Sequence, residues 1–222
     1  MSSIEVTAFR WVPPFAQGVV RDLRARWALE EAGIPYETRL IDHEDLASSE
    51  YRTQQPFGQV PVYREDGLTL FESGAIVLHI AEKTERLLPH DPEARARVIA
   101  WLFAALNSIE PPIQNLAGID LFYAGQEWTK DHRPQVVEQV KTRLTDLSKA
   151  LERKDYLEDR FTVADLMMTT VLRILRHTDL LAQFPVIEAF RIRCEARPAF
   201  DKALADQMAP FAKNAPPDQP SP

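Results

Sequence analysis

The sequence has almost no cysteine, no long hydrophobic run and no excess of positive charge. Cys194 is the only cysteine among the 222 residues, so no disulfide can form within the chain. The apolar runs are far shorter than the roughly 20 residues of a membrane helix, and the first residues lack the basic start and apolar block of a secretory leader. The net charge of −7 argues against a general nucleic-acid or anionic-lipid surface. These absences predict a cytoplasmic protein without membrane or nucleic-acid partners.

The composition and the order of the patterns predict two domains. Hydrophobic residues make up 45% and charged residues 27% of the sequence, values typical of a globular protein. Strand and helix patterns alternate up to about residue 86, whereas only helical patterns follow. We therefore expect an α/β domain at residues 1–86, a linker at 87–91, an all-α helical bundle at 92–213 and a disordered tail at 214–222.

The first third of the chain reads as strand, helix and second strand. Residues Ile4–Phe9 alternate between apolar and polar as a strand does. Pro13 and Pro14 then exclude both a helix interior and a central strand. Apolar residues at helical spacing follow in 20–29, and residues 36–41 predict the second strand.

Residues 55–83, QPFGQVPVYREDGLTLFESGAIVLHIAEK, predict two strands joined by a tight turn and followed by a helix. Pro61 comes at the head of the first strand, a position that tolerates proline. The pair Asp66-Gly67 favours a two-residue hairpin loop. The helix opens at Ser73, and apolar residues recur at helical spacing after it.

Two features of this stretch suit a peptide-like anion. Ser73 and Gly74 lie where the N–H groups of a helix start lack partners, which favours a carboxylate. Val60 precedes Pro61 and is therefore extended, so its backbone can pair with another backbone in an edge position. A cis bond at Pro61 would turn these groups toward a ligand. The alternative is an ordinary hairpin followed by a capped helix.

The remaining sequence is helical. Residues 94–116 and 133–151 carry apolar residues at helical spacing, and Pro111-Pro112 is expected to kink or divide the first of these helices. Thr162 and Asp165 form a capping-box pattern that starts an apolar helix at 166–175. A further helix is expected at 186–197, and a last helical stretch follows Pro198.

The motifs QPFGQVP and FESGAI, in this order and at this separation, closely resemble the glutathione-binding half of cytosolic glutathione S-transferases. The resemblance extends more loosely over about residues 4–204, and the TVAD stretch at 162–165 resembles the family's C-terminal capping motif. It implies a thioredoxin-like N-terminal domain with a cis-proline after a valine, a helical C-terminal domain, glutathione as co-substrate and a homodimer.

The resemblance also implies which residues hold glutathione. Val60 would bind through its backbone beside Pro61, and Gln59 would reach the ligand too. Glu72 would take the γ-glutamyl amino group and Ser73 the carboxylate. The alternative role of the last two residues is capping of the helix that they open.

The segment after the first strand departs from the family pattern. The family activates the glutathione thiol with a Tyr, Ser or Cys there, and residues 10–18 contain none of these. Gln17 is our candidate donor to the thiolate, with a solvated loop amide as the alternative. Trp11 is a second candidate, as an indole N–H donor or a cover for the substrate, with a packed loop aromatic as the alternative. The N–H groups of residues 15–19, at the expected helix start, could also lower the thiol pKa. Arg24 is interpreted as a helix-surface residue without a specific role.

A second substrate is expected against Phe15 and the first C-terminal helix, near Leu106, Asn107 or Glu110. This placement, between the two domains, follows from the family architecture alone. No metal site is expected, because the adjacent residues 42–45 (DHED) are interpreted as a solvated turn.

The leading hypothesis is an enzyme that adds the glutathione thiolate to a small hydrophobic electrophile in detoxification, or reduces a peroxide or disulfide with it. The alternative is a non-catalytic binding or interaction protein of the same fold. A transferase that depends on a catalytic cysteine is disfavoured, because residues 10–18 offer no such nucleophile.

Overall fold

The computed structural model describes residues 3–216, which form two compact units. The first unit extends to Leu87 and also takes in the chain from Pro198 onward, and the second unit is Leu88–Arg197. The first contains a four-stranded sheet with helices, and the second is helical. This architecture confirms the predicted fold class, a thioredoxin-like domain and a helical bundle.

The sheet of the first unit is mixed, with the strand order β2-β1-β3-β4. Parallel pairing joins β1 to β2, and antiparallel pairing joins β1 to β3 and β3 to β4. The strands are β1 (Ile4–Phe9), β2 (Glu37–Ile41), β3 (Tyr63–Glu65) and β4 (Leu68–Leu70). The two-residue turn at Asp66-Gly67 is confirmed, and both residues have the positive φ that such turns require.

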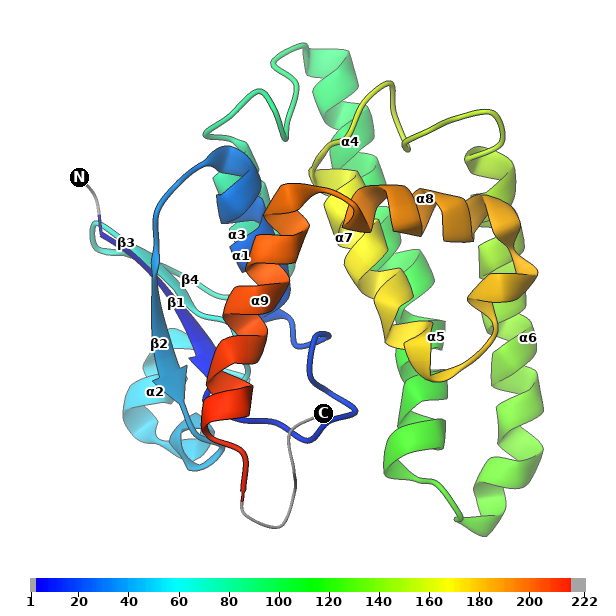
Figure 1. The fold of residues 1–222 in the computed structure, drawn as a ribbon, viewed down its shortest axis with the longest axis horizontal. Coiled ribbons are helices and arrows are strands. Elements are labelled where there is room, and N and C mark those ends of the chain that lie inside the picture. The colour runs from blue at the N-terminus through cyan, green and yellow to red at the C-terminus, as the bar shows by residue number, and fades with distance from the viewer. Residues whose placement is uncertain (1–2, 217–222) are drawn as a thin grey trace. The chain divides into compact units, whose positions relative to one another are not determined.

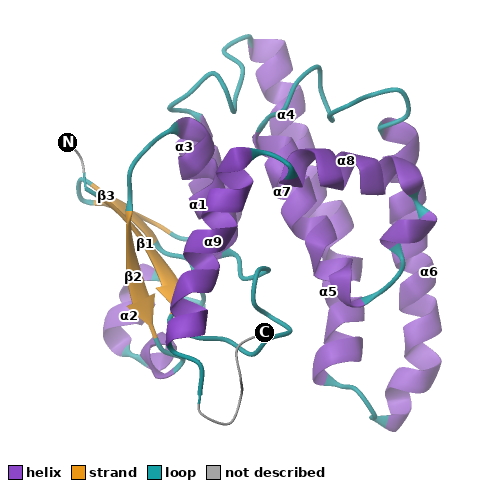
Figure 2. Ribbon diagram, viewed as in Figure 1, coloured by secondary structure: helices purple, strands orange, loops and turns teal. Residues whose placement is uncertain are grey.

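Four α-helices accompany this sheet, and Figure 2 shows α1, α3 and α9 gathered on one side of the strands. They are α1 (Asp22–Ala32), α2 (Ser49–Gln54), α3 (Ser73–Ala81) and α9 (Pro198–Lys213), with a short 3-10 turn at Glu44–Ala47. Gly33 ends α1 in the left-handed conformation, which glycine adopts without strain. Tyr51 of α2 packs with Ile41 and Val62 in a separate small core.

The last helix packs on the first, as the neighbouring labels α1 and α9 in Figure 1 indicate. The ring centroids of Trp27 and Phe200 lie 4.8 Å apart. The side-chain amide of Gln207 donates to Asp22 Oδ1 at 2.7 Å and to the carbonyl of Val20 at 3.1 Å. The helix expected within the 92–213 domain therefore belongs to the first unit, because its apolar face and one buried amide are satisfied by α1.

The second unit consists of helices in which π-helical and 3-10 segments interrupt the α-helical run. Its elements are α4 (Pro92–Ala104), a π segment η2 (Ala105–Ile109), α5 (Glu110–Ala117), a π segment η3 (Gly118–Phe122), α6 (Glu127–Ala150), α7 (Val163–Leu172), two 3-10 segments (Arg173–His177 and Leu181–Gln183) and α8 (Pro185–Glu195). The expected division near Pro111-Pro112 occurs as the π segment, which ends just before the prolines enter the first turn of α5.

The capping box at the start of α7 is confirmed. Thr162 Oγ1 accepts from the N–H of Ala164 at 3.3 Å, and Asp165 Oδ2 accepts from the N–H of Thr162 at 2.8 Å. Asp165 also accepts from the N–H of Leu157, so one carboxylate joins the preceding loop to the helix. Burial raises the pKa of Asp165 to about 6 although these hydrogen bonds favour its ionised form.

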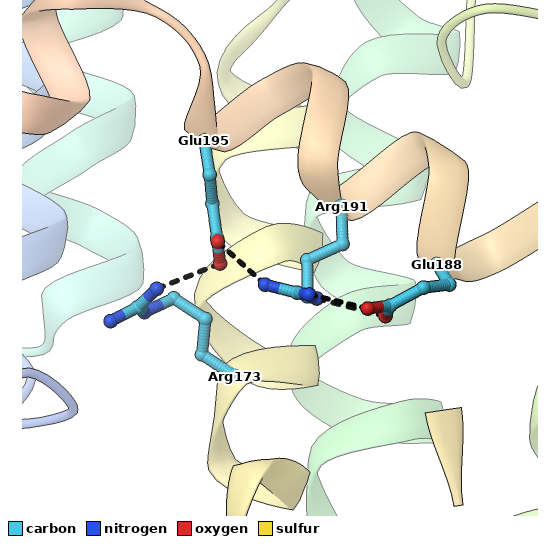
Figure 3. A network of polar contacts seen from close by, with 4 residues as sticks. All are labelled: Arg173, Glu188, Arg191 and Glu195. Atoms are coloured by element: carbon cyan, nitrogen blue, oxygen red, sulfur yellow. Dashed lines mark hydrogen bonds and ion pairs between the residues drawn. The ribbon is translucent and has the colours of Figure 1, made fainter. Parts of the chain in front are cut away.

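An ion-pair chain fastens α8 to the end of α7 (Figure 3). Arg173 Nη1 lies 2.7 Å from Glu195, and Arg191 lies between Glu195 and Glu188 at 2.5 and 2.6 Å. Because the four side chains are partly buried and alternate in sign, the pairs are better formed than isolated surface pairs.

Two further expectations concern membranes and the tail. Within residues 3–216, every helix is too short or too polar to cross a bilayer. The expected tail at 214–222 falls mainly outside the described residues, which end at 216. Asn214 still bonds to the carbonyl of Pro210 at the end of α9.

Candidate functional site

The predicted backbone-binding residue Val60 lies between α2 and β3. Val60 is buried, the Val60–Pro61 peptide bond is cis, and neither the N–H nor the C=O of Val60 has a hydrogen-bond partner within residues 3–216. Pairing with the sheet begins at Val62, whose carbonyl accepts from the N–H of Thr7 at 2.9 Å. Val60 therefore keeps one donor and one acceptor for another backbone, as strand addition requires.

A chain of hydroxyl groups fixes the segment on both sides of Pro61. The N–H of Val62 donates to Thr7 Oγ1 at 2.7 Å, and Thr7 Oγ1 lies 3.3 Å from Tyr51 Oη. Tyr51 Oη donates to the carbonyl of Gln59 at 2.7 Å, so the Thr7 hydroxyl is the donor to Tyr51. Burial raises the pKa of Tyr51, which keeps the phenol protonated. Thr7 and Tyr51 thus hold the main chain of residues 59–62.

The first residues of α3 form the second part of the predicted binding half. Ser73 is buried, whereas the side chain of Glu72 is exposed and makes no capping hydrogen bond to α3. The capping role considered for Glu72 is therefore wrong. Glu72 has φ 67° and ψ 113°, a conformation that is unfavourable for a residue with a Cβ and is found mainly at functional positions.

Arg24 contacts this position from α1. Its Nη1 donates to Ser73 Oγ at 3.1 Å, and both side chains are buried. The interpretation of Arg24 as a surface residue is wrong, because α1 is covered by both α3 and α9 and buries residues around most of its circumference.

Glu65 fastens the hairpin to α3. Its carboxylate accepts from Tyr63 Oη at 2.9 Å, from His79 Nε2 at 3.0 Å and from Lys83 Nζ at 2.7 Å. Burial alone would raise the pKa of Glu65, but the hydrogen bonds from Lys83, His79 and Tyr63 outweigh it and lower the pKa to about 2. The start of α3 is therefore held against the strand that follows Pro61.

The loop after β1 is folded into turns of its own. The N–H groups of Ala16, Gln17 and Val19 donate to carbonyls two or three residues earlier in the loop, at 2.8–3.3 Å. α1 begins only at Asp22, so the expected helix start near residues 15–19 is wrong. Because these three N–H groups are already bonded, they are poor donors for a thiolate.

Gln17 is buried rather than solvated, so the alternative of a solvated amide is wrong. Its Nε2 donates to the carbonyl of Val12 at 3.0 Å, while Oε1 has no hydrogen-bond partner within the described residues. One amide hydrogen remains after the bond to Val12. Trp11 is half-buried, and Phe15 is exposed at the tip of the loop.

The other residues predicted for the second substrate belong to the helical unit. Leu106 is half-buried in the π segment, and Asn107 beside it is exposed. Glu110 opens α5 and is buried, with Gln114 Nε2 at 3.5 Å from its Oε1. Such π segments occur often at functional positions.

The residues 42–45 form a closed turn. Asp42 pairs with Arg10 at 3.1 Å, and Asp45 accepts from the N–H of Asp42 at 2.8 Å. Among residues 3–216, no three His, Cys, Asp or Glu side chains are grouped as a metal site would need. The expectation of no metal stays a prediction.

Comparison with known proteins matches both units. The N-terminal domain model of glutathione S-transferases matches residues 16–82, and the C-terminal domain model matches residues 101–198. Glutathione S-transferase 4 of Zea mays is 31% identical over 230 residues, covering 99% of this chain and all of the maize protein. The disulfide-bond oxidoreductase YfcG of Escherichia coli is 30% identical and covers 79% of this chain and 86% of that protein.

A solved structure agrees with these matches. A glutathione transferase from Burkholderia graminis, with two glutathione molecules bound per subunit, is 27% identical to this chain. It superposes with a TM-score of 0.80, covering 91% of this chain and 88% of the other. With both domain models matched in order, and with full-length similarity to the maize enzyme, the chain belongs to the glutathione S-transferase family.

Proposed function

We propose that this glutathione transferase binds glutathione along residues 59–61 and at residues 72–73, and adds its thiolate to a small hydrophobic electrophile. The observation that carries the proposal is the buried backbone of Val60, which has no hydrogen-bond partner within residues 3–216. It lies in the same motif as Ser73 at the start of α3. A backbone and a carboxylate of one peptide suit these two features.

Glutathione-dependent reduction of a disulfide or peroxide is the second candidate reaction. It is favoured by the similarity to YfcG, which is described as a disulfide-bond oxidoreductase. The non-catalytic alternative is not favoured, since the related chains named above are enzymes.

For activation of the thiol we propose Gln17, with Trp11 as the neighbouring candidate. Gln17 is supported by its burial and by its bond to Val12, which holds the amide in one orientation and leaves one N–H to donate. A fixed donor stabilises a thiolate more than a mobile one does, because less order is lost when the charge forms.

For the electrophile we propose contacts with Phe15, Leu106 and Glu110. An exposed aromatic ring and a half-buried leucine suit a hydrophobic substrate. This chemistry fits a detoxifying enzyme of the cytoplasm, a compartment in which the single buried Cys194 stays reduced.

We also propose a homodimer that buries the aromatic pair Phe57 and Phe71. Phe57 is 62% exposed and Phe71 37% exposed, and their ring centroids lie 6.2 Å apart. Two exposed phenylalanines in contact are typical of an association surface. Phe57→Ser is expected to shift the protein toward the monomer in sedimentation experiments, and an unchanged mass would remove this surface from the interface.

Calorimetric titration with glutathione tests the binding proposal, and conjugation of chlorodinitrobenzene tests the reaction. Saturable binding together with turnover supports both parts. Saturable binding without turnover on aryl halides, but with reduction of a mixed disulfide, would favour the second candidate reaction. Absence of binding at millimolar glutathione would contradict the proposal.

A further inference from the structure

Arg24 is a buried cation placed beside the start of α3. It is the third residue of α1 and is 3% exposed, and its Nη1 donates to Ser73 Oγ at 3.1 Å. The contact joins residues 49 positions apart in the chain, because α1 and α3 pack against each other. A guanidinium keeps its charge at any physiological pH. One positive charge is therefore fixed next to Ser73.

The bond from Arg24 decides what the Ser73 hydroxyl can do. A serine hydroxyl has one hydrogen to donate and two positions that accept. Arg24 fills an accepting position, and the Ser73 side chain makes no other hydrogen bond within residues 3–216. The hydroxyl hydrogen therefore stays available and points away from the guanidinium, toward a group that accepts.

The backbone at the same position also lacks acceptors. The first main-chain bond of α3 runs from the N–H of Ile76 to the carbonyl of Glu72 at 3.0 Å. The earlier N–H groups, at Ser73, Gly74 and Ala75, have no hydrogen-bond partner among the described residues. A helix start of this kind carries partial positive charge, which the nearby guanidinium increases.

We propose that Arg24 is a positioning residue for the γ-glutamyl carboxylate of glutathione. It holds the Ser73 hydroxyl so that its hydrogen meets the carboxylate, and it adds positive charge to the start of α3. At 3% exposure it acts through Ser73 and does not touch the ligand. The inference rests on the proposed binding of glutathione at Ser73.

The test compares glutathione with 4-aminobutanoyl-cysteinylglycine, which lacks the α-carboxylate but keeps the amino group. Calorimetry of the wild type is expected to show clear preference for glutathione. Arg24→Met is expected to bind glutathione roughly tenfold to a hundredfold more weakly, because a hydrogen bond to a charged group is lost. Its affinity for the analogue is expected to stay within about twofold, since the lost contact serves the absent carboxylate.

A double-mutant cycle shows whether Arg24 acts through Ser73. In a Ser73→Ala background, Arg24→Met is expected to add less than about threefold, because the hydroxyl that it positions is already gone. Arg24→Lys keeps the charge and is expected to lie between the wild type and Arg24→Met. The matched control is Arg143→Met, an exposed arginine of the helical unit, for which glutathione affinity is expected to be unchanged.

The outcomes separate this inference from the proposed function. A wild type that does not bind glutathione contradicts the proposed function itself. A wild type that binds and prefers glutathione, with Arg24→Met keeping that preference or weakening both peptides equally, overturns only the role of Arg24. Thermal melts identify a variant that fails to fold. Should Arg24→Met fail, Arg24→Lys carries the same comparison, and an unchanged preference for glutathione in Arg24→Lys and Arg24→Gln overturns the role.

Discussion

Residues 55–83 and the loop between β1 and α1 differ in how they use their hydrogen-bonding groups. In the first region, buried side chains from elsewhere in the unit fix the main chain, and the backbone of Val60 and the start of α3 keep groups for a ligand. In the loop, the backbone N–H groups close turns, and Gln17 spends one of its hydrogens on Val12. The first region is organised for binding, and the second is organised to hold its own shape.

The difference bears on how the enzyme divides its task. Binding of the peptide part of glutathione rests on several fixed groups, so each single loss is expected to weaken it measurably. Activation of the thiol rests on no hydroxyl or thiol side chain in residues 10–18, and so depends on weaker donors of the loop. We therefore expect variants of the binding half to have larger effects than variants of the loop.

The largest effect is expected for Ser73→Ala. It removes the hydroxyl that would meet a buried carboxylate, and we expect glutathione binding to weaken by about 1–3 kcal/mol. Isothermal titration measures the affinity directly. Ser108→Ala, an exposed serine of the helical unit, is the control and should bind like the wild type. An affinity unchanged in Ser73→Ala would remove this residue from the site and with it the contrast between the two regions.

Tyr51→Phe should follow, through the shape of the binding segment. It deletes the hydroxyl between Thr7 and the carbonyl of Gln59, leaving both groups buried and less well paired, so we expect the free energy of unfolding to fall by about 1–2 kcal/mol. Glutathione affinity is expected to drop severalfold as residues 59–62 loosen. Urea unfolding and calorimetry check the two effects. Tyr123→Phe, with an exposed ring, is the control. Loss of stability with full affinity would show that Tyr51 supports the fold and not the site.

Glu65 provides a pH-dependent test of the same region. Its pKa is lowered to about 2 in the folded state from an ordinary value of 4.5, so ionised Glu65 stabilises the fold fully above pH 4.5. This contribution is lost as the pH falls from 4.5 toward 2, where the folded protein also takes up the proton. Unfolding free energies of Glu65→Gln and the wild type should therefore differ at pH 6 and converge in acid. A difference that is constant with pH would contradict the role of Glu65, and Glu127→Gln, at an exposed position, is the control.

Gln17→Ala is expected to have the smallest effect. If its remaining N–H donates to the thiolate, its loss should raise the pKa of bound glutathione by about one unit or less. The pH dependence of kcat/KM measures this shift. A profile identical to the wild type would leave Gln17 as a brace for the loop through Val12, and a shift of several units would show that the loop contributes as much as the binding half.

The local patterns of the sequence predicted most of the first unit. Period-two alternation marked β1, Asp66-Gly67 marked the hairpin turn, and Thr162 with Asp165 marked the start of α7. The start of α1 was missed, because consecutive turns in residues 16–21 keep nearly helical spacing while the regular helix begins only at Asp22.

Contacts between distant residues left no such pattern. Arg24 and Ser73 are 49 positions apart, and Thr7 and Tyr51 are 44 positions apart, so neither pair follows a helical or strand period. The amphipathic pattern of α9 predicted a helix with one buried face but could not indicate that α1 covers that face. For the same reason the sequence identified Ser73 in the candidate site and missed the arginine beside it.

The most direct test of the account is a glutathione titration of the wild type near neutral pH that follows thiolate absorbance and heat of binding together. We predict saturable heat, which reports the binding half, and a saturable thiolate signal at the same concentrations, which reports activation without a hydroxyl side chain from residues 10–18. Heat without a thiolate signal would contradict the proposed activation, and no heat at any concentration would contradict the proposed site as a whole.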